Sequence, residues 1–113
     1  MTYIKINDAV YPAAFRGYER DRDWNDRESK AITVEMDHAT AASTFVDELA
    51  WSIVMDIETE NEAGEIVIVQ EEYDNNEFSV AGSITDNRDG TVTVKMGKPT
   101  AEERLAELME VLA

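Results

Sequence analysis

Trp51-Ser-Ile-Val-Met-Asp-Ile-Glu58 and Ile66-Val-Ile-Val69 are the two stretches that decide the fold of this chain. In the first, large apolar residues recur at every second position, which is the period of a half-buried β-strand. The second is apolar at every position, which predicts a central strand covered on both faces. Asn61-Glu-Ala-Gly64 between them has the composition of a turn. Together they predict two paired strands within a larger sheet.

Alternating segments on both sides of this pair predict further strands. They are residues 3–6, 10–15, 30–36, 78–85 and 91–96. Pro12 places its strand at an edge or a bulge, because proline cannot donate to a ladder. Gly82 predicts a bulge, and Asn87-Arg-Asp-Gly90 is typical of a hairpin turn.

Two segments favour helices. Asp37 is a candidate cap for a short helix that extends to about Asp47, and Thr100 with Glu103 forms a capping box at the start of a C-terminal helix. We expect the apolar stripe of the second helix to pack on the sheet or on a second copy of the chain. This stripe consists of Leu105, Leu108, Met109 and Leu112. Residues 19–30 are dense in charge and predict an exposed loop.

These elements predict a single domain over residues 1–113 with an α+β fold. We expect a mostly antiparallel twisted sheet of about six or seven strands, with a short middle helix and a C-terminal amphipathic helix. The chain is 43% hydrophobic, which is sufficient for a buried core.

Positive residues are missing from the middle of the chain. Residues 31–87 contain 14 acids and neither lysine nor arginine, and the net charge of the whole chain is −15. A partner with a positive surface would be steered by this field. Five of the ten bases lie in residues 16–30, so we expect one charge-mixed segment and one acidic face.

No catalytic or metal site is predicted. The chain has no cysteine and one histidine, His38, which we interpret as a cap or surface residue because a general base needs a positioned partner. One segment is spaced like a calcium loop but lacks the glycine and glutamate that such a loop requires at its sixth and twelfth positions. Its residues are Asp21, Asp23, Asn25 and Asp26. We therefore predict a non-enzymatic protein with no cofactor and no metal ion.

The composition also narrows the partners and the location. A pI near 4.2 argues against direct binding of nucleic acid, because phosphate contacts require Lys and Arg. The sequence contains no apolar run near the roughly 18 residues of a membrane helix, and its N-terminus lacks a signal-peptide pattern. We expect a cytoplasmic protein that does not contact a membrane, with a homo-oligomer left open.

The acids around the predicted turn are the candidate partner-binding residues. They are Asp56, Glu58, Glu60, Glu62, Glu65, Glu71, Glu72 and Asp74. The first three would form a row on one strand face at a spacing of about 6.6 Å, and Glu65 would lie near Glu60 across the turn. Like charges facing each other cost stability. Three interpretations remain: a solubilising surface, an adaptation to salt, or a surface made for a basic groove.

Trp24 completes the candidate partner-binding set. It is flanked by Arg20, Arg22 and Arg27. Because aromatic and Arg side chains dominate interface hot spots, one interpretation is a binding anchor. The other is a lid that folds back on the core. Trp51, on an apolar strand face, is predicted to be a core residue.

Three stretches resemble small acidic proteins encoded in phages and prophages of Gram-positive bacteria. They are Asp23-Trp-Asn-Asp-Arg-Glu-Ser-Lys30, Leu49-Ala-Trp-Ser-Ile53 and Ile84-Thr-Asp-Asn-Arg-Asp-Gly-Thr-Val-Thr-Val-Lys-Met-Gly97. The resemblance implies either a tail or baseplate module of the virion, or a counter-defence protein such as an anti-CRISPR protein. Proteins of the second kind often occupy the basic nucleic-acid channel of a host nuclease.

We therefore expect an acidic protein-binding module, a phage-encoded inhibitor that blocks a basic nucleic-acid-binding surface of a host defence nuclease. Its partner would be a basic host protein, in the sharpest version a CRISPR nuclease. Carboxylates would take the place of phosphates against Lys and Arg. The alternative is a phage tail or baseplate protein that assembles through its sheet edge or its C-terminal helix.

Overall fold

The computed structural model describes residues 1–112, which form seven strands, two α-helices and one 3-10 helix. The elements are β1 (Thr2–Ile6), β2 (Ala9–Asp21), η1 (Arg22–Trp24), β3 (Arg27–Glu35), α1 (His38–Thr44), β4 (Trp51–Glu60), β5 (Ile66–Asp74), β6 (Val80–Asp86), β7 (Thr91–Gly97) and α2 (Ala101–Leu112). The strands form one sheet in the order β5-β4-β1-β2-β3-β7-β6, and every neighbouring pair is antiparallel. The predicted α+β architecture with a mostly antiparallel sheet is confirmed.

The long strand β2 belongs to both halves of this sheet. Its pairing with β1 ends at Pro12, opposite Tyr3, and its pairing with β3 begins at Ala13, opposite Val34. The edge position predicted from Pro12 is wrong, because β2 lies inside the sheet. An interior strand accepts this proline because it sits where β2 changes partners, before β3 requires an N–H group.

The sheet curls so that its two edges approach each other at one end. β5 and β6 are the opposite edge strands, yet only residues 75–79 connect them. Six strand spacings in a flat sheet would separate these edges by roughly 29 Å, whereas the connection spans at most about 21 Å. The connection also bonds to the start of β4, since Asn75 N–H donates to Trp51 O at 2.9 Å.

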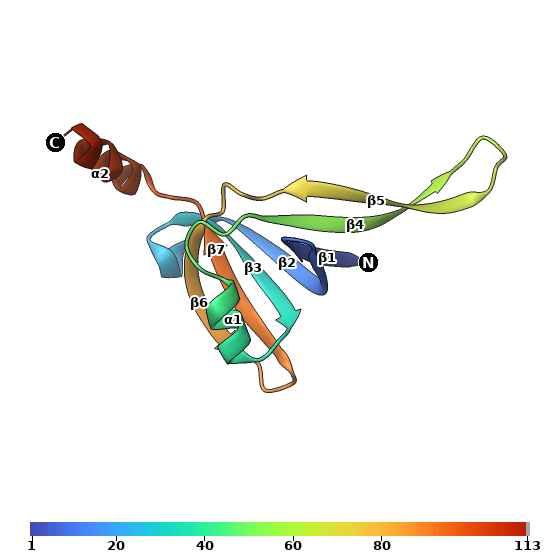
Figure 1. The fold of residues 1–113 in the computed structure, drawn as a ribbon, viewed down its shortest axis with the longest axis horizontal. Coiled ribbons are helices and arrows are strands. Elements are labelled where there is room, and N and C mark those ends of the chain that lie inside the picture. Colours follow the sequence, from blue (N-terminus) through green and yellow to red (C-terminus); the bar gives the residue numbers. More distant parts are fainter. Residues whose placement is uncertain (113) are drawn as a thin grey trace.

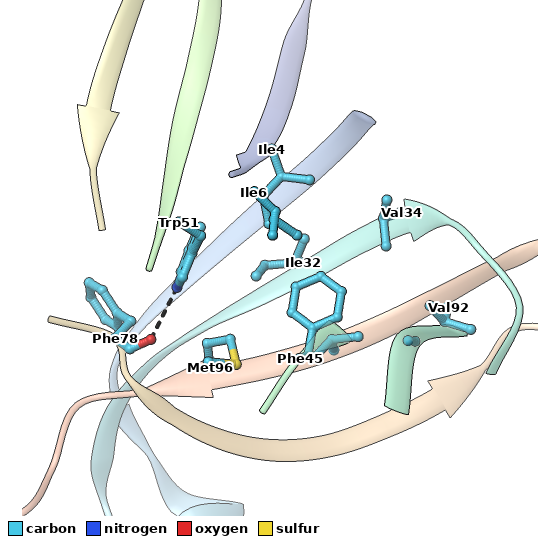
Figure 2. Close-up of a cluster of buried hydrophobic side chains, with 11 residues drawn as sticks. Ile4, Ile6, Ile32, Val34, Phe45, Trp51, Phe78, Val92 and Met96 are labelled. Atoms are coloured by element: carbon cyan, nitrogen blue, oxygen red, sulfur yellow. Dashed lines mark hydrogen bonds between the residues drawn. The ribbon is translucent and has the colours of Figure 1, made fainter. Parts of the chain in front are cut away.

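The core lies on the concave face of the curled sheet, around Trp51 (Figure 2). Trp51 is 1% exposed, and its indole Nε1 donates to the Phe78 carbonyl at 3.1 Å. Phe15 stacks on the indole with ring centroids 6.2 Å apart. Strands β3 and β7 contribute the branched residues that pack beneath α1 and Phe45, among them Ile32. The prediction of Trp51 as a core residue is confirmed.

Several local predictions are also confirmed. Asp37 caps α1, because its Oδ1 accepts from Thr40 N–H at 2.6 Å. The register between β6 and β7 shifts between Ala81 and Ile84, which places a bulge at Gly82. The turn from β6 to β7 has positive φ at Gly90, as the Asp-Gly pair predicts.

The exposed loop predicted for residues 19–30 is largely wrong. β2 continues to Asp21 and β3 starts at Arg27, which leaves only η1 and two left-handed residues, Asn25 and Asp26, to make the turn. Charge suggested exposure, but Asp21 and Arg27 are both buried. Each makes an ion pair with a residue far along the chain.

Helix α2 extends from the sheet on the side opposite to the β4–β5 hairpin (Figure 1). The predicted capping box is present: Thr100 N–H donates to Glu103 Oε1 at 2.8 Å, and Glu103 N–H donates to Thr100 Oγ1 at 3.2 Å. The predicted packing of this helix on the sheet is wrong, because Leu105, Leu108 and Met109 are exposed. α1 already covers the concave face near β6 and β7. The side chain of Leu112 lies outside the described residues.

Candidate functional site

The outer part of the β4–β5 hairpin is a two-stranded ribbon, which we call the arm (residues 57–69). β1 accompanies β4 only as far as Met55, with a last bond from Asp56 N–H to Met1 O at 2.9 Å. Beyond this point β4 and β5 pair only with each other, and the ribbon leaves the rest of the sheet (Figure 1). The long axis of the molecule is 61 Å, against 35 and 27 Å for the others. Two-stranded hairpins are marginally stable alone in water. The arm is such a hairpin, and no third strand extends it within residues 1–112.

The register of β4 and β5 places most of the predicted acids on one face. Directly paired residues share a face, and alternate residues along a strand return to it. The face opposite Trp51, the outer face, therefore carries the acids of both strands except Glu71. These acids are Asp56, Glu58, Glu60, Glu72 and Asp74. The predicted row of three carboxylates along β4 is consistent with this register.

The register also separates the carboxylates across the ribbon. Glu58 pairs with Ile68, Glu60 with Ile66, and Asp56 with Gln70. The predicted proximity of Glu65 to Glu60 is not supported, because Asn61 N–H donates to Glu65 O at 2.9 Å and thus Glu65 lies opposite Asn61. The hairpin avoids direct acid-acid pairs, which lowers the repulsion that the composition suggests.

The acids nearest the body have structural partners. Glu72 Oε1 lies 3.4 Å from Lys5 Nζ. Asp56 accepts from the Tyr3 hydroxyl at 3.0 Å and from Gln70 Nε2 at 3.1 Å, and this carboxylate raises the pKa of Tyr3. Asp74 accepts from Asn76 N–H at 2.7 Å, and Glu71 accepts from the Tyr73 hydroxyl. These four carboxylates therefore form hydrogen bonds or an ion pair within the chain itself.

The acids at the tip form no ion pair within residues 1–112. They are Glu58, Glu60, Glu62 and Glu65, and all four are exposed. The arm thus carries four negative charges and no base. Four uncompensated carboxylates on one ribbon make a local field that a positively charged partner would relieve.

Exposed apolar side chains accompany these acids, and sequence reasoning missed this. Ile66 is 74% exposed and Ile68 is 69% exposed. The interpretation of residues 66–69 as a central, doubly covered strand is wrong, because β5 is an edge strand of the sheet. Ile57, Val67 and Val69 lie on the other face of the arm, which continues the concave face outward. The sequence signal for this surface is an apolar run on both strand faces next to a turn whose only charged residues are acidic.

The free edge of β5 exposes backbone groups as well as side chains. Asn61 N–H donates to Glu65 O at one end of the ladder, and Asn75 N–H donates to Trp51 O at the other end. The hydrogen-bonded pairs between β4 and β5 are therefore the odd-numbered residues. Alternation along an antiparallel ladder then directs the N–H and C=O groups of the even-numbered residues away from β4. In β5 these residues are Ile66, Ile68, Gln70, Glu72 and Asp74. No other strand within residues 1–112 pairs with this edge.

Trp24 does not lie with the acids. Its indole packs on the backbone of β6 and β7, where a methyl group added to Gly82 would lie 2.6 Å from Trp24 Cη2. The Arg27 guanidinium lies 4.6 Å from the centre of the indole. Arg27 Nη1 also donates to Glu103 Oε1 at 2.7 Å and to Lys98 O at 2.8 Å. The indole therefore packs on the sheet outside the core cluster, and Arg27 joins it to the start of α2. The lid and the binding anchor both stay predictions.

The segment that resembles a calcium loop is used for another purpose. Asp21 is buried and forms an ion pair with Lys95 Nζ at 2.8 Å, and it accepts from Ser29 Oγ at 3.0 Å. The hydrogen bond from Lys95 holds the pKa of Asp21 below its usual range. Within the described chain no three acidic or histidine side chains gather as a metal ion would require.

Neither α-helix within residues 1–112 has the length and apolar content of a membrane span. Comparisons of the chain with protein-family models, with curated proteins and with solved structures gave no significant match. The function is therefore argued from the geometry of the arm.

Proposed function

We propose that this protein is a non-enzymatic acidic binding module that places its arm on a basic surface of a nucleic-acid-handling host protein. The observation that carries the proposal is the arm itself, a projecting ribbon with exposed isoleucines, no base, and four acids that form no ion pair within residues 1–112. Carboxylates and phosphates compete for the same Lys and Arg donors. The bound module would therefore block nucleic acid from the surface that it covers.

The mixed character of the arm supports a protein partner. Charge steers encounter and sets specificity, whereas apolar burial supplies much of the affinity. Glu58 and Glu60 supply the first property, and Ile66 and Ile68 supply the second on the same face. A simple solubilising surface would not require exposed isoleucines among its acids.

The resemblance to phage-encoded acidic proteins gives the sharp version of this proposal. In that version the partner is a host defence nuclease of the CRISPR type, and the protein is an inhibitor in the bacterial cytoplasm. The inhibitor would compete with guide or target nucleic acid for a basic channel.

Charge reversal on the arm tests the proposal. The variant Glu58→Lys with Glu60→Lys and Glu62→Lys should lose capture of basic host proteins, with affinity lowered on the order of 100-fold because like charges brought together cost several kcal/mol. The matched control is Glu19→Lys with Asp23→Lys and Glu35→Lys, which changes the net charge equally at exposed positions off the arm. Wild-type binding should weaken with salt and in the presence of competing DNA.

Two results would contradict the proposal. One is unchanged capture by the arm variant, and the other is equal loss in both triple variants, which would indicate an effect of net charge alone. Inhibition of a purified CRISPR nuclease, measured with the same three proteins, tests the sharp version separately.

A second function, a structural or accessory protein of a phage tail or baseplate, is favoured by α2. Leu105, Leu108 and Met109 of this helix are exposed to solvent, as they would be in an assembly element. Stable retention in purified virions, or a homo-oligomer that persists at high salt, would select this function over the inhibitor.

A further inference from the structure

We propose that the β5 edge of the arm accepts an extended segment of the partner as an eighth strand, and that this segment alternates basic and apolar residues. This inference rests on the proposed function and specifies how the same surface is used. Edge strands with unpaired backbone groups are templates for strand addition.

The backbone of β5 is suited to this pairing. The outward N–H and C=O groups of Ile66, Ile68 and Gln70 form a regular row on an edge that is straight enough to stay paired with β4 over nine consecutive positions. Neither a proline nor a glycine occurs in β5, and its ladder to β4 has no register shift. Natural edge strands are often blunted by a proline or a bulge, and β5 has neither.

The two faces of the arm define the side chains of the added strand. On the concave side the arm shows Ile57, Val67 and Val69, which would take apolar side chains. On the outer side, Lys or Arg stems would lie over Ile66 and Ile68 while their charged ends reach the carboxylates of β4. The added strand would lie two strand spacings, roughly 10 Å, from β4, a distance that an extended Lys or Arg side chain and a Glu side chain span together. Successive side chains of the added strand would point to opposite faces, so basic and apolar residues must alternate along it.

A second copy of this chain fits the edge less well. Pairing of two arms would bring together two ribbons that each carry four acids and no base, and like charges across a sheet are destabilising. The charge of the arm therefore favours a basic occupant over self-association.

The test uses the whole protein and a defined probe. The probe is a synthetic peptide of the length of β5 in which Lys alternates with Val. The control peptide has the same sequence with every backbone amide N-methylated, so that the charge and the side chains are kept while both edges of the strand lose their N–H donors. We expect the control to bind at least about tenfold more weakly, because it loses several backbone hydrogen bonds. Amide exchange should slow at Ile66, Ile68 and Gln70, whereas the amides directed at β4 should change little.

A pair of variants at one position tests the same point from the protein side. Ile68→Pro removes an outward N–H, which an edge strand tolerates, and should weaken peptide binding at least about tenfold. Ile68→Ala keeps that N–H and serves as the matched control with a smaller loss. The circular dichroism spectra of both variants should match that of the wild type.

Equal binding of the two peptides, or binding of neither, overturns the strand-addition inference. Slowed exchange at the outward amides without peptide, growing with protein concentration, overturns it in favour of a second copy. Neither result touches the proposed function, which fails on its own terms if the triple charge reversal leaves capture of the host protein intact.

Discussion

Strands β3 and β5 have similar apolar residues and opposite environments. In β3, Ile32 and Val34 are almost completely buried beneath α1 and its neighbours, whereas in β5 Ile66 and Ile68 are mostly exposed. The difference is not in the local residue types but in what lies beyond each strand. β3 has a partner on both sides, and β5 has one. The comparison shows that an apolar strand favours burial but does not specify what buries it. The chain itself buries β3, whereas we propose that a partner buries β5.

The largest expected effect is on the free energy of unfolding, for a substitution in the core of the body. Trp51→Ala removes the central core side chain and its bond to Phe78, and should lower the free energy of unfolding by about 3–5 kcal/mol. Ile68→Ala on the arm should change it by less than about 0.5 kcal/mol. Urea unfolding of the two variants measures both values. Similar losses would mean that the arm contributes to the core.

An intermediate effect is expected where Trp24 meets the sheet. Gly82→Ala would bring a methyl group to 2.6 Å from Trp24, and should cost about 1–3 kcal/mol through overpacking. Gly17→Ala is the control, because nothing lies within 4 Å of its added methyl group. Thermal unfolding and tryptophan fluorescence report the result. An unchanged spectrum and stability for Gly82→Ala would show that Trp24 does not pack on the sheet, and would favour the binding-anchor interpretation.

Acid should loosen the link between α2 and the body. The Arg27 side chain, with help from Thr100 N–H, lowers the pKa of Glu103 from 4.5 to about 2. A lowered folded-state pKa gives stability that is present above pH 4.5 and lost as the pH falls toward 2. The Glu103 side chain is 45% exposed, so the contribution of the pair is below about 1 kcal/mol. Comparison of wild type with Glu103→Gln over this pH range should show the difference vanish in acid; a constant difference would assign the effect to packing.

The smallest effect is expected for stability at the tip of the arm. Glu58→Lys with Glu60→Lys should alter the free energy of unfolding by less than about 0.5 kcal/mol, with a slight gain where repulsion is relieved. Differential scanning calorimetry measures this change. A large loss would place these carboxylates in the fold and weaken the case for a binding role.

Sequence reasoning succeeded where the signal is local. The capping box of Thr100 and Glu103, the cap at Asp37 and the turn at Gly90 each depend on residues a few positions apart. Predictions of these features require no knowledge of tertiary contacts.

The failures all concern long-range context. The local sequence predicts that Arg27 lies in an exposed charged loop, because its partner, Glu103, is 76 positions away. The run Ile66-Val-Ile-Val69 predicts a buried strand, because nothing in it distinguishes a central strand from an exposed edge strand. Charge alone identifies the acids of the candidate site, and the period of a strand places three of them on one face. The open edge of β5 cannot be predicted in this way, because it depends on the order of the strands in the sheet.

The curled sheet has a consequence for the order in which the chain can fold. β3 pairs with β7 across a separation of 60 residues, as between Thr33 and Thr93, so the body closes only when nearly the whole chain is present. The β4–β5 hairpin is local and can form within microseconds of its synthesis. On a ribosome the acidic ribbon would therefore exist before β7 has closed the body. Its negative charge would then act first as a guard, keeping an uncovered strand edge from pairing with other nascent chains.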